Sequence, residues 1–204
     1  TQSMLAAAER IFELLDAEEM EEETGKPALP EVHGDVTFKH VSFGYTPEVQ
    51  LMKDLNIDVK AGETVAIVGP TGAGKTTVIN LLMRFYDITG GAIEIDGHNI
   101  QDYTKESLRS KVGMVLQDTW LFKGTIRENI RYSRQDATDE EVVAAAKQAF
   151  ADDFIRKLPK GYDTVITEES DNISQGQKQL LTIARAILAS PSVFILDEAT
   201  SNVD

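Results

Sequence analysis

The chain contains no cysteine among its 204 residues. This absence excludes disulfide bonds, thiolate metal sites and a cysteine nucleophile, and it fits a reducing compartment. Basic residues are also scarce: 20 Lys and Arg stand against 34 Asp and Glu, for a formal net charge of −14. Because nucleic acid phosphates are bound by clustered Lys and Arg, this balance disfavours DNA or RNA as a partner. No apolar run approaches the ~18 residues that cross a bilayer, and the first residues show no signal-peptide pattern.

The remaining composition is that of an ordinary globular protein, with 42% apolar and 26% charged residues. This length suits one sizeable α/β domain, or a core with a subdomain. At the start, apolar residues from Ala8 to Leu15 recur at helical spacing before an acidic run, which predicts an amphipathic helix. The segment "TGKPALP" then predicts a linker. Residues 1–30 are therefore interpreted as a helix and linker, which either pack on the same domain or emerge from a preceding one.

Residues 31–204 combine short strand patterns with longer helical ones. Strands are predicted in "VTFKHVSFGY", "LNIDVKAG", "TVAIVG", "GAIEIDG", "VGMVLQ" and "SVFILDEAT". Helices are predicted in "TTVINLLMRFY" and in "ATDEEVVAAAKQAFADDFIRKL", where Thr138 and Glu141 have the spacing of a capping box. The chain reads as mostly helical from about residue 118 to 185. We therefore expect an α/β fold whose mixed sheet is interrupted by a helical insert.

The segment "GPTGAGKT" matches the P-loop pattern from Gly69 to Thr76, with a helix after it. A buried strand is expected before it, over Val65–Val68. Glycines let backbone N–H groups turn toward an anion, and the positive end of the helix dipole adds to the attraction. Lys75 reaches the outer phosphates, and the Thr76 hydroxyl suits Mg²⁺, which prefers oxygen ligands. The candidate phosphate-binding residues are Gly69, Thr71, Gly72, Ala73, Gly74, Lys75, Thr76 and Thr77.

A carboxylate for the metal follows another apolar strand, in "SVFILDE". P-loop sites need such a carboxylate, normally at the end of a neighbouring buried strand. Asp197 is therefore expected to hold Mg²⁺ directly or through water. Glu198, one residue further, is placed to orient and partly deprotonate a water molecule aimed at a γ-phosphate.

A second helix start suited to phosphate lies far downstream, in "DNISQGQKQLLTIARAILA". Ser174 precedes the helical run, so it is either an N-cap or an anion donor, and Gly176 permits close backbone approach. Capping alone explains Ser174. It leaves Gly176 and the flanking Gln175 and Gln177 without a role. The candidates for a second anion site are therefore Ser174, Gln175, Gly176 and Gln177.

Together these motifs resemble the nucleotide-binding domain of the ABC transporter family, over essentially the whole chain. "NISQGQ" is similar to the family signature, "GPTGAGKT" to its P-loop, "VFILDE" to its second nucleotide motif and "SNVD", Ser201–Asp204, to its D-loop. Gln117 matches the glutamine loop, and Tyr45 matches the aromatic residue that stacks on adenine. "AAAERIFELLD" and "NLLMRFYD" look most like multidrug or lipid exporters, in which a membrane domain precedes this domain in one polypeptide.

The resemblance implies an ABC ATPase fold: a P-loop NTPase core with a mixed β-sheet, an antiparallel β subdomain and a helical insert. It implies that two such domains, identical or divergent, pair head to tail. Each ATP would lie between the P-loop of one domain and the signature of the other. The further partner implied is a transmembrane domain of the same polypeptide, which places this domain at the cytoplasmic face of the cell membrane.

The resemblance also assigns roles to single residues. The catalytic residues it implies are Lys75, Gln117 and Glu198. The Mg²⁺ ligands it implies are Thr76, Gln117 and Asp197. The ATP contacts it implies are Tyr45, the P-loop residues through Thr77, and Ser174, Gln175, Gly176 and Gln177, the last four toward the partner's ATP.

The chain departs from the family at two points. Ser170 and Asp171 stand where a glycine is expected before the signature. In the family, a histidine downstream of the D-loop contacts the γ-phosphate, whereas this sequence stops at Asp204 and its three histidines do not match that role. We therefore expect the chain to be truncated at its C-terminal end and, in isolation, to be a weak or inactive ATPase.

Other interpretations compete with an exporter. A soluble ABC-type ATPase that regulates ribosomes or chromosomes would have no membrane domain; the acidic balance and the exporter-like start disfavour it. A nucleotide kinase or GTPase is disfavoured because the guanine-reading Asn-Lys-x-Asp pattern is absent. The apolar Trp120, Leu121 and Phe122 either pack inward or form an exposed patch for a membrane-domain helix.

Overall fold

The computed structural model describes residues 23–69, 74–116, 119–167 and 172–197, so the helix expected near the start of the chain lies outside the described residues. The strands are β1 (Val36–Phe43), β2 (Met52–Val59), β3 (Gly90–Ile95), β4 (His98–Asn99), β5 (Val112–Val115), β6 (Gly124–Thr125), β7 (Val165–Ile166) and β8 (Val193–Leu196). The helices are α2 (Lys75–Leu82), α3 (Lys105–Ser110), α4 (Ile126–Arg131), α5 (Asp139–Gln148), α6 (Asp152–Lys157) and α7 (Gln175–Leu188). Short 3₁₀ turns are η1 (Ile100–Asp102) and η2 (Gly161–Asp163). This mixed α/β arrangement confirms the fold class expected from the sequence.

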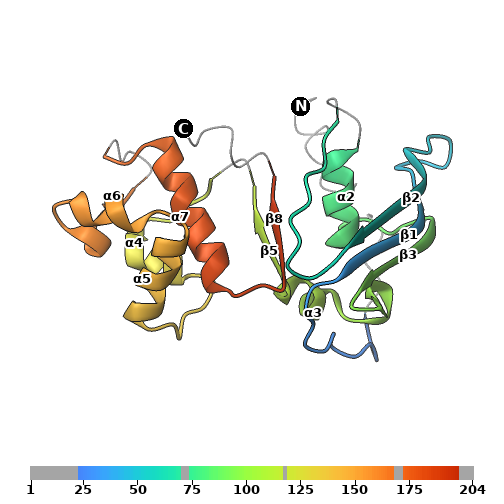
Figure 1. Cartoon of the computed structure of the whole chain (residues 1–204), viewed down its shortest axis with the longest axis horizontal. Helices are drawn as coiled ribbons and strands as arrows, with labels where there is room; N and C mark the ends of the chain where they lie inside the picture. Colours follow the sequence, from blue (N-terminus) through green and yellow to red (C-terminus); the bar gives the residue numbers. More distant parts are fainter. Residues whose placement is uncertain (1–22, 70–73, 117–118, 168–171, 198–204) are drawn as a thin grey trace, which may run out of the picture.

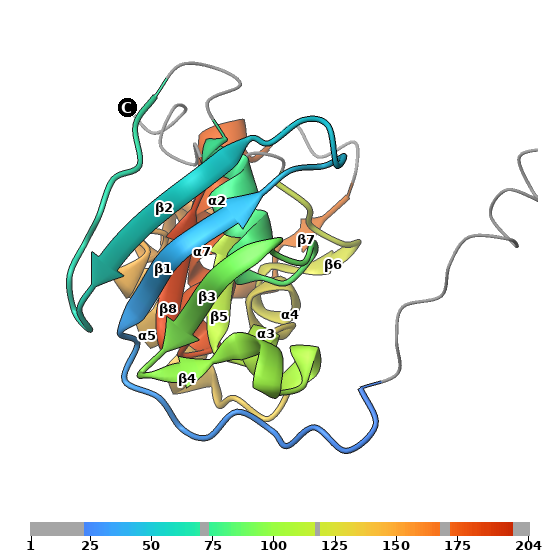
Figure 2. The same cartoon turned by 90° about the vertical axis from the view of Figure 1, so that its right-hand side faces the viewer.

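An antiparallel sheet forms one side of the molecule, in the strand order β2-β1-β3-β4. Its inner face carries Val36, Phe38, Val41 and Phe43 of β1, all buried. Side chains alternate across a strand, and a register shift between Phe38 and Val41 keeps the apolar ones on the same face. This face packs with α2, where Leu81 is buried in the same core, and Figure 2 shows the helix behind the sheet.

Helices α4 to α7 form the other side of the molecule (Figure 1). Their common core includes Ile130, Val142, Ile155 and Leu181, one from each helix and all fully buried. The helical insert expected from the sequence is therefore present. In the described part of the chain, no helix has the length and apolar character that crossing a bilayer requires.

The helix predicted in "ATDEEVVAAAKQAFADDFIRKL" begins as expected but does not run through. Thr138 Oγ1 accepts a hydrogen bond from Glu141 N at 3.2 Å, and Glu141 Oε2 accepts one from Thr138 N at 2.8 Å, so the capping box is confirmed. The helix then divides into α5 and α6, because Phe150 adopts a φ of 58° between them. Neither glycine nor proline marks this break, which is why the sequence pattern did not indicate it.

The expected buried strand over Val65–Val68 is wrong. Val65, Ile67 and Val68 are 53%, 47% and 87% exposed, and the segment forms no strand. A strand needs a neighbour to complete its backbone hydrogen bonds, and among the described residues β8 pairs with β5 alone. The helix after the P-loop is also shorter than expected: α2 ends at Leu82, and Arg84 adopts a φ of 52° in the turn that follows.

The parallel pair β5–β8 lies between the two sides of the molecule (Figure 1). Val112 pairs with Val193 and Val115 with Leu196, so both strands expected from the sequence are confirmed. Residues before β1 pack on the sheet side, where Leu29 is buried. The domain boundary near residue 30 stays a prediction.

Asp96, in the turn between β3 and β4, binds the backbone just before β1. Its carboxylate accepts hydrogen bonds from the N–H groups of His33, Gly34 and Asp35, the last two at 3.0 Å and 2.8 Å. Partial burial acts to raise the pKa of Asp96, but these hydrogen bonds outweigh it and hold the pKa below its ordinary value of 3.8. The carboxylate therefore stabilises the fold while it is ionised.

We expect Asp96→Asn to lower the free energy of unfolding by about 1–3 kcal/mol at neutral pH, because three N–H groups lose their charged acceptor. A folded-state pKa below the unfolded-state value gives stability that is full above the unfolded pKa and is lost as the pH falls through the folded pKa. The difference between the two proteins should therefore shrink below about pH 4. Urea unfolding across this range measures it, with Asp102→Asn at an exposed position as the control. A difference that does not change with pH contradicts this account.

Candidate functional site

The start of α2 is the first candidate anion site. Its N-cap, Gly74, has a φ of 89°, a left-handed conformation that glycine adopts without strain. No side chain among the described residues caps this end of the helix. An α-helix leaves its first N–H groups without intrahelical acceptors, so the first turn can donate to a bound phosphate.

Lys75 is the first residue of α2, and its side chain reaches Gly69. Lys75 Nζ donates a hydrogen bond to the carbonyl oxygen of Gly69 at 2.6 Å. The structure therefore brings the two ends of the P-loop pattern together, while Thr71, Gly72 and Ala73 lie outside the described residues. The next residue, Thr76, is exposed, and its hydroxyl is available to a ligand.

Asp197 follows β8 directly. Its N–H donates to the carbonyl oxygen of Val115 at 3.0 Å, so the parallel pairing continues up to this residue. Because the carboxyl ends of parallel strands meet at one edge of a sheet, the segments that follow β5 and β8 begin side by side. Gln117 and Glu198 belong to these two segments and lie outside the described residues.

Two of the expected metal ligands, Thr76 of α2 and Asp197 after β8, have side chains that fit Mg²⁺. Thr76 offers a hydroxyl and Asp197 a carboxylate, both hard oxygen ligands of the kind that Mg²⁺ takes together with nucleotide phosphates. Among the described residues no group of three or more His, Cys, Asp and Glu could hold a metal ion. Gln117, the third expected ligand, lies outside the described residues.

Tyr45 lies in an aromatic cluster beside α2. Its ring centroid is 4.9 Å from that of Phe43 and 5.1 Å from that of Tyr86, with both pairs nearly perpendicular. The Tyr45 hydroxyl lies 3.0 Å from Oγ1 of Thr77, a buried residue of the first turn of α2. The expected adenine platform and the P-loop helix are thus in direct contact. Tyr86 was not among the residues predicted for this site. In the sequence it is marked only as an aromatic residue just after the P-loop helix.

The start of α7 is the second candidate anion site, and it is capped. Ser174 Oγ accepts from Gln177 N at 3.1 Å, and Gln177 Oε1 accepts from Ser174 N at 3.0 Å. The expectation that capping leaves Gln177 without a role is therefore corrected. Gln175 donates from Nε2 to Thr119 Oγ1 at 2.7 Å. Gly176 adds no side chain to this first turn.

The two helix starts do not form one site within the chain. Figure 1 shows α2 and α7 on opposite sides of the β5–β8 pair. The predicted residues therefore fall into two groups. One contains Tyr45, Gly69, Lys75, Thr76 and Thr77, and the other contains Ser174, Gln175, Gly176 and Gln177. Asp197 lies at the end of the β5–β8 pair.

The apolar segment after β5 is divided between core and surface. Leu121 packs against the core of the helical side, whereas Trp120 is 59% exposed. The rings of Trp120, Phe122 and Tyr132 lie within 6.2 Å of one another, centroid to centroid. Arg185 of α7 lies over Trp120 and Tyr132, at 5.7 Å and 5.5 Å from the ring centroids. Leu121 therefore packs inward and Trp120 is exposed, while a contact with a membrane-domain helix stays a prediction.

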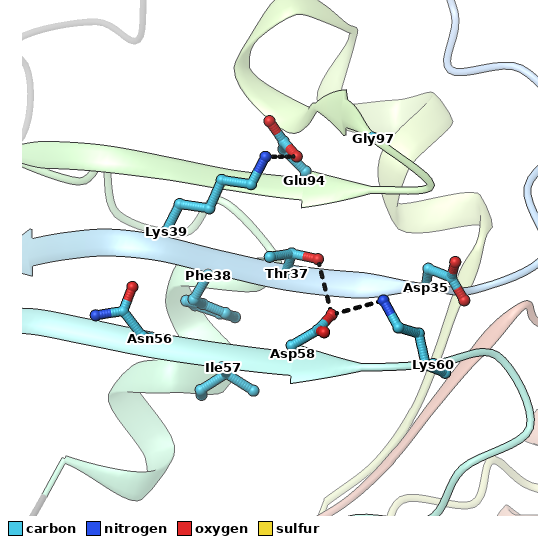
Figure 3. Close-up of a pocket in the computed structure, with 10 residues that line it drawn as sticks. All are labelled: Asp35, Thr37, Phe38, Lys39, Asn56, Ile57, Asp58, Lys60, Glu94 and Gly97. Atoms are coloured by element: carbon cyan, nitrogen blue, oxygen red, sulfur yellow. Dashed lines mark hydrogen bonds and ion pairs between the residues drawn. The ribbon is translucent and has the colours of Figure 1, made fainter.

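A described pocket lies elsewhere, on the outer face of the antiparallel sheet (Figure 3). Its volume is about 590 Å³. Both of its lysines are paired with carboxylates, since Lys39 lies 2.7 Å from Glu94 and Lys60 lies 3.1 Å from Asp58, and Asp35 adds a further negative charge. It is lined by none of the residues selected from the sequence, and we therefore do not place the functional site there.

Comparison with known proteins gives consistent results. Residues 52–201 match the family model described as ABC transporter. The chain is 58% identical over 203 residues to an uncharacterized ABC transporter ATP-binding protein of Bacillus subtilis, covering 99% of this chain and 34% of that protein. It is 55% identical over 203 residues to a fatty acid ABC transporter ATP-binding/permease protein of Mycobacterium bovis, covering 100% and 32%. The chain spans about a third of the length of the curated relatives it matches.

A solved structure is also similar. The structure of a bacterial Atm1-family ABC exporter with ATP bound matches with a TM-score of 0.85 and 44% sequence identity. The match covers 100% of this chain and 36% of that one. The likeness therefore extends over the whole chain in both sequence and fold.

We expect Ser174→Ala to lower the free energy of unfolding by about 1 kcal/mol, because Gln177 N loses its acceptor at the start of α7. Ser174→Asp should retain the stability, since Asp is an equally good N-cap and its negative charge suits a helix N-terminus. Chemical unfolding of the two variants against the unaltered chain measures the effect. Equal stability of the Ala variant and the unaltered chain contradicts the capping role.

Proposed function

The chain belongs to the ABC transporter family, and from this premise we propose that it is the nucleotide-binding domain of an exporter, which binds and hydrolyses MgATP to power transport. One observation carries the proposal: a single chain presents two phosphate-ready helix starts on opposite sides of the β5–β8 pair. ATP bound at the start of α2 does not contact the start of α7 in the same chain. A second domain therefore has to supply that helix start. Head-to-tail pairing of two domains completes both sites.

The proposed reaction is attack of water on the γ-phosphate, with ADP as the leaving group. Lys75 exchanges its bond to the Gly69 carbonyl for the outer phosphates, where its charge offsets the negative charge of the transition state. Thr76 and Asp197 hold Mg²⁺, which neutralises phosphate charge when bound. Glu198 orients the attacking water and takes its proton.

The remaining candidate residues assist in binding and alignment. Gln117 contacts the metal or the attacking water through a neutral amide. Tyr45 stacks on adenine, and backbone N–H groups of the P-loop hold the phosphates. From the other domain, Ser174, Gly176 and Gln177 approach the γ-phosphate. Positioning and charge neutralisation therefore supply most of the rate enhancement.

The proposed partners are a second nucleotide-binding domain and a transmembrane domain in the same polypeptide, at the cytoplasmic face of the membrane. The Mycobacterium bovis relative is named an ATP-binding/permease protein, which supports an exporter over a soluble regulator. Sequencing the gene upstream of the codon for Thr1 tests this choice. Several spans of about 20 apolar residues there support the exporter, and their absence contradicts it.

We expect Glu198→Gln to lower kcat for ATP hydrolysis about 100- to 10,000-fold in the full-length protein that contains this chain, the range for loss of a general base. The dissociation constant for MgATP should stay near that of the unaltered protein, because the amide keeps the size of the carboxylate. Phosphate release and equilibrium binding measure the two quantities. An unchanged turnover rate contradicts the role assigned to Glu198.

We expect the isolated nucleotide-binding domain that contains this chain, with Glu198→Gln, to form dimers only in the presence of MgATP. Adding Ser174→Asp should abolish the dimer without loss of stability. The introduced carboxylate still caps the helix, but its negative charge repels the γ-phosphate of the partner's ATP. Gly176→Glu should do the same. Sedimentation velocity with and without MgATP measures the association. A dimer that persists in both double variants contradicts the proposed sharing of ATP.

A further inference from the structure

Tyr86 contacts the proposed adenine platform but was not among the residues selected from the sequence. Its ring centroid lies 5.1 Å from that of Tyr45, with an angle of 88° between the ring planes. Phe43 contacts the same ring from β1, with a centroid distance of 4.9 Å and an angle of 82°. Edge-to-face geometry of this kind is favourable beyond the burial of apolar area. Tyr45 therefore has two aromatic neighbours that restrict its orientation.

The turn that carries Tyr86 is held firmly by backbone and side-chain hydrogen bonds. Phe85 N donates to the Asn80 carbonyl of α2 at 2.9 Å. Arg109 donates to the carbonyl oxygens of Met83 and Arg84, at 3.0 Å and 3.1 Å. Tyr86 thus follows directly on a turn that hydrogen bonds to α2 and α3 hold in place.

Tyr45 has less support of its own. It follows β1 and begins the turn that is closed by the Thr46–Val49 bridge. Its side chain is 54% exposed, so its orientation depends on the rings of Phe43 and Tyr86 and on the hydroxyl contact with Thr77. The exposed part of the ring remains free for a stacked base. Fixing a ring in its binding orientation before the ligand arrives reduces the entropy lost on binding.

We propose that Tyr86 is a positioning residue that holds the ring of Tyr45 in the orientation required to stack on the adenine base of ATP. The proposal rests on the proposed function, in which Tyr45 is the adenine platform. Both Thr77 and Tyr86 contact Tyr45, the first from the start of α2 and the second from the turn after it. One helix therefore sets the position of the phosphate-binding turn and of the base-binding ring.

The test compares a ligand that has a base with one that lacks it. Dissociation constants for MgATP and for magnesium tripolyphosphate are measured by calorimetry on the full-length protein that contains this chain and on its variants. Tyr86→Leu should raise the dissociation constant for MgATP about two- to tenfold, the range for loss of one aromatic pair. The constant for tripolyphosphate should not change, because Tyr86 acts only on the base. Tyr86→Phe keeps the ring and should bind both ligands as the unaltered chain does.

Phe85→Leu is the matched control, because this neighbouring ring packs on the Arg109 guanidinium, 4.9 Å from its centroid. It should leave the ratio of the two dissociation constants unchanged. If Tyr86→Leu weakens both ligands equally, or neither, the proposal is overturned. If Tyr45→Leu raises the ratio and Tyr86→Leu does not, the proposal alone fails and the adenine platform stands. If Tyr45→Leu leaves the ratio unchanged, the adenine platform fails and the proposal with it. If the unaltered full-length protein binds no MgATP, the proposed function itself fails.

Discussion

The junction between α7 and β8 determines how the two sides of the molecule are placed. The N–H groups of Ser192 and Val193 donate to one carbonyl oxygen, that of Lys111, at 2.9 Å and 3.1 Å, and start the parallel pairing with β5. Pro191 packs so closely that a Cβ on Gly113 of β5 would lie 2.6 Å from its ring. The turn that follows α7 therefore has little freedom, and it fixes the helix relative to the strands.

The same junction contacts the segment before β1. Ser192 Oγ donates to the Val32 carbonyl at 2.9 Å, and the Ser192 carbonyl oxygen would lie only 2.3 Å from a Cβ on Gly34. Gly34 has a φ of 112°, so both its conformation and this close approach require glycine. A short stretch of chain thereby joins the helical side, the parallel pair and the antiparallel sheet. The spacing of the two candidate anion sites depends on this contact, because α7 carries one site and α2, which packs on the antiparallel sheet, carries the other.

Local patterns predicted much of this arrangement. The capping box of Thr138 and Glu141 and the parallel strands before Gln117 and Asp197 follow from residue spacing within single segments. The link between Tyr45 and Tyr86 joins residues distant in the sequence, and only the packing of β1 on α2 brings them together. The predicted strand over Val65–Val68 failed because it too depended on distant residues. An apolar run has the composition of a strand whether or not a neighbouring strand pairs with it.

The capped start of α7 is compatible with a role in anion binding. The box made by Ser174 and Gln177 satisfies the N–H of the third helical residue, Gln177. An α-helix leaves several N–H groups of its first turn without intrahelical acceptors, so those of Gln175 and Gly176 keep their capacity to donate outward. The box also fixes the helix end in a single chain, so that its dipole and donors are oriented before a phosphate arrives. Capping thus reduces the entropy lost in ordering the start of α7 when two domains pair. The same residues stabilise one chain and belong to the proposed ATP site of its partner.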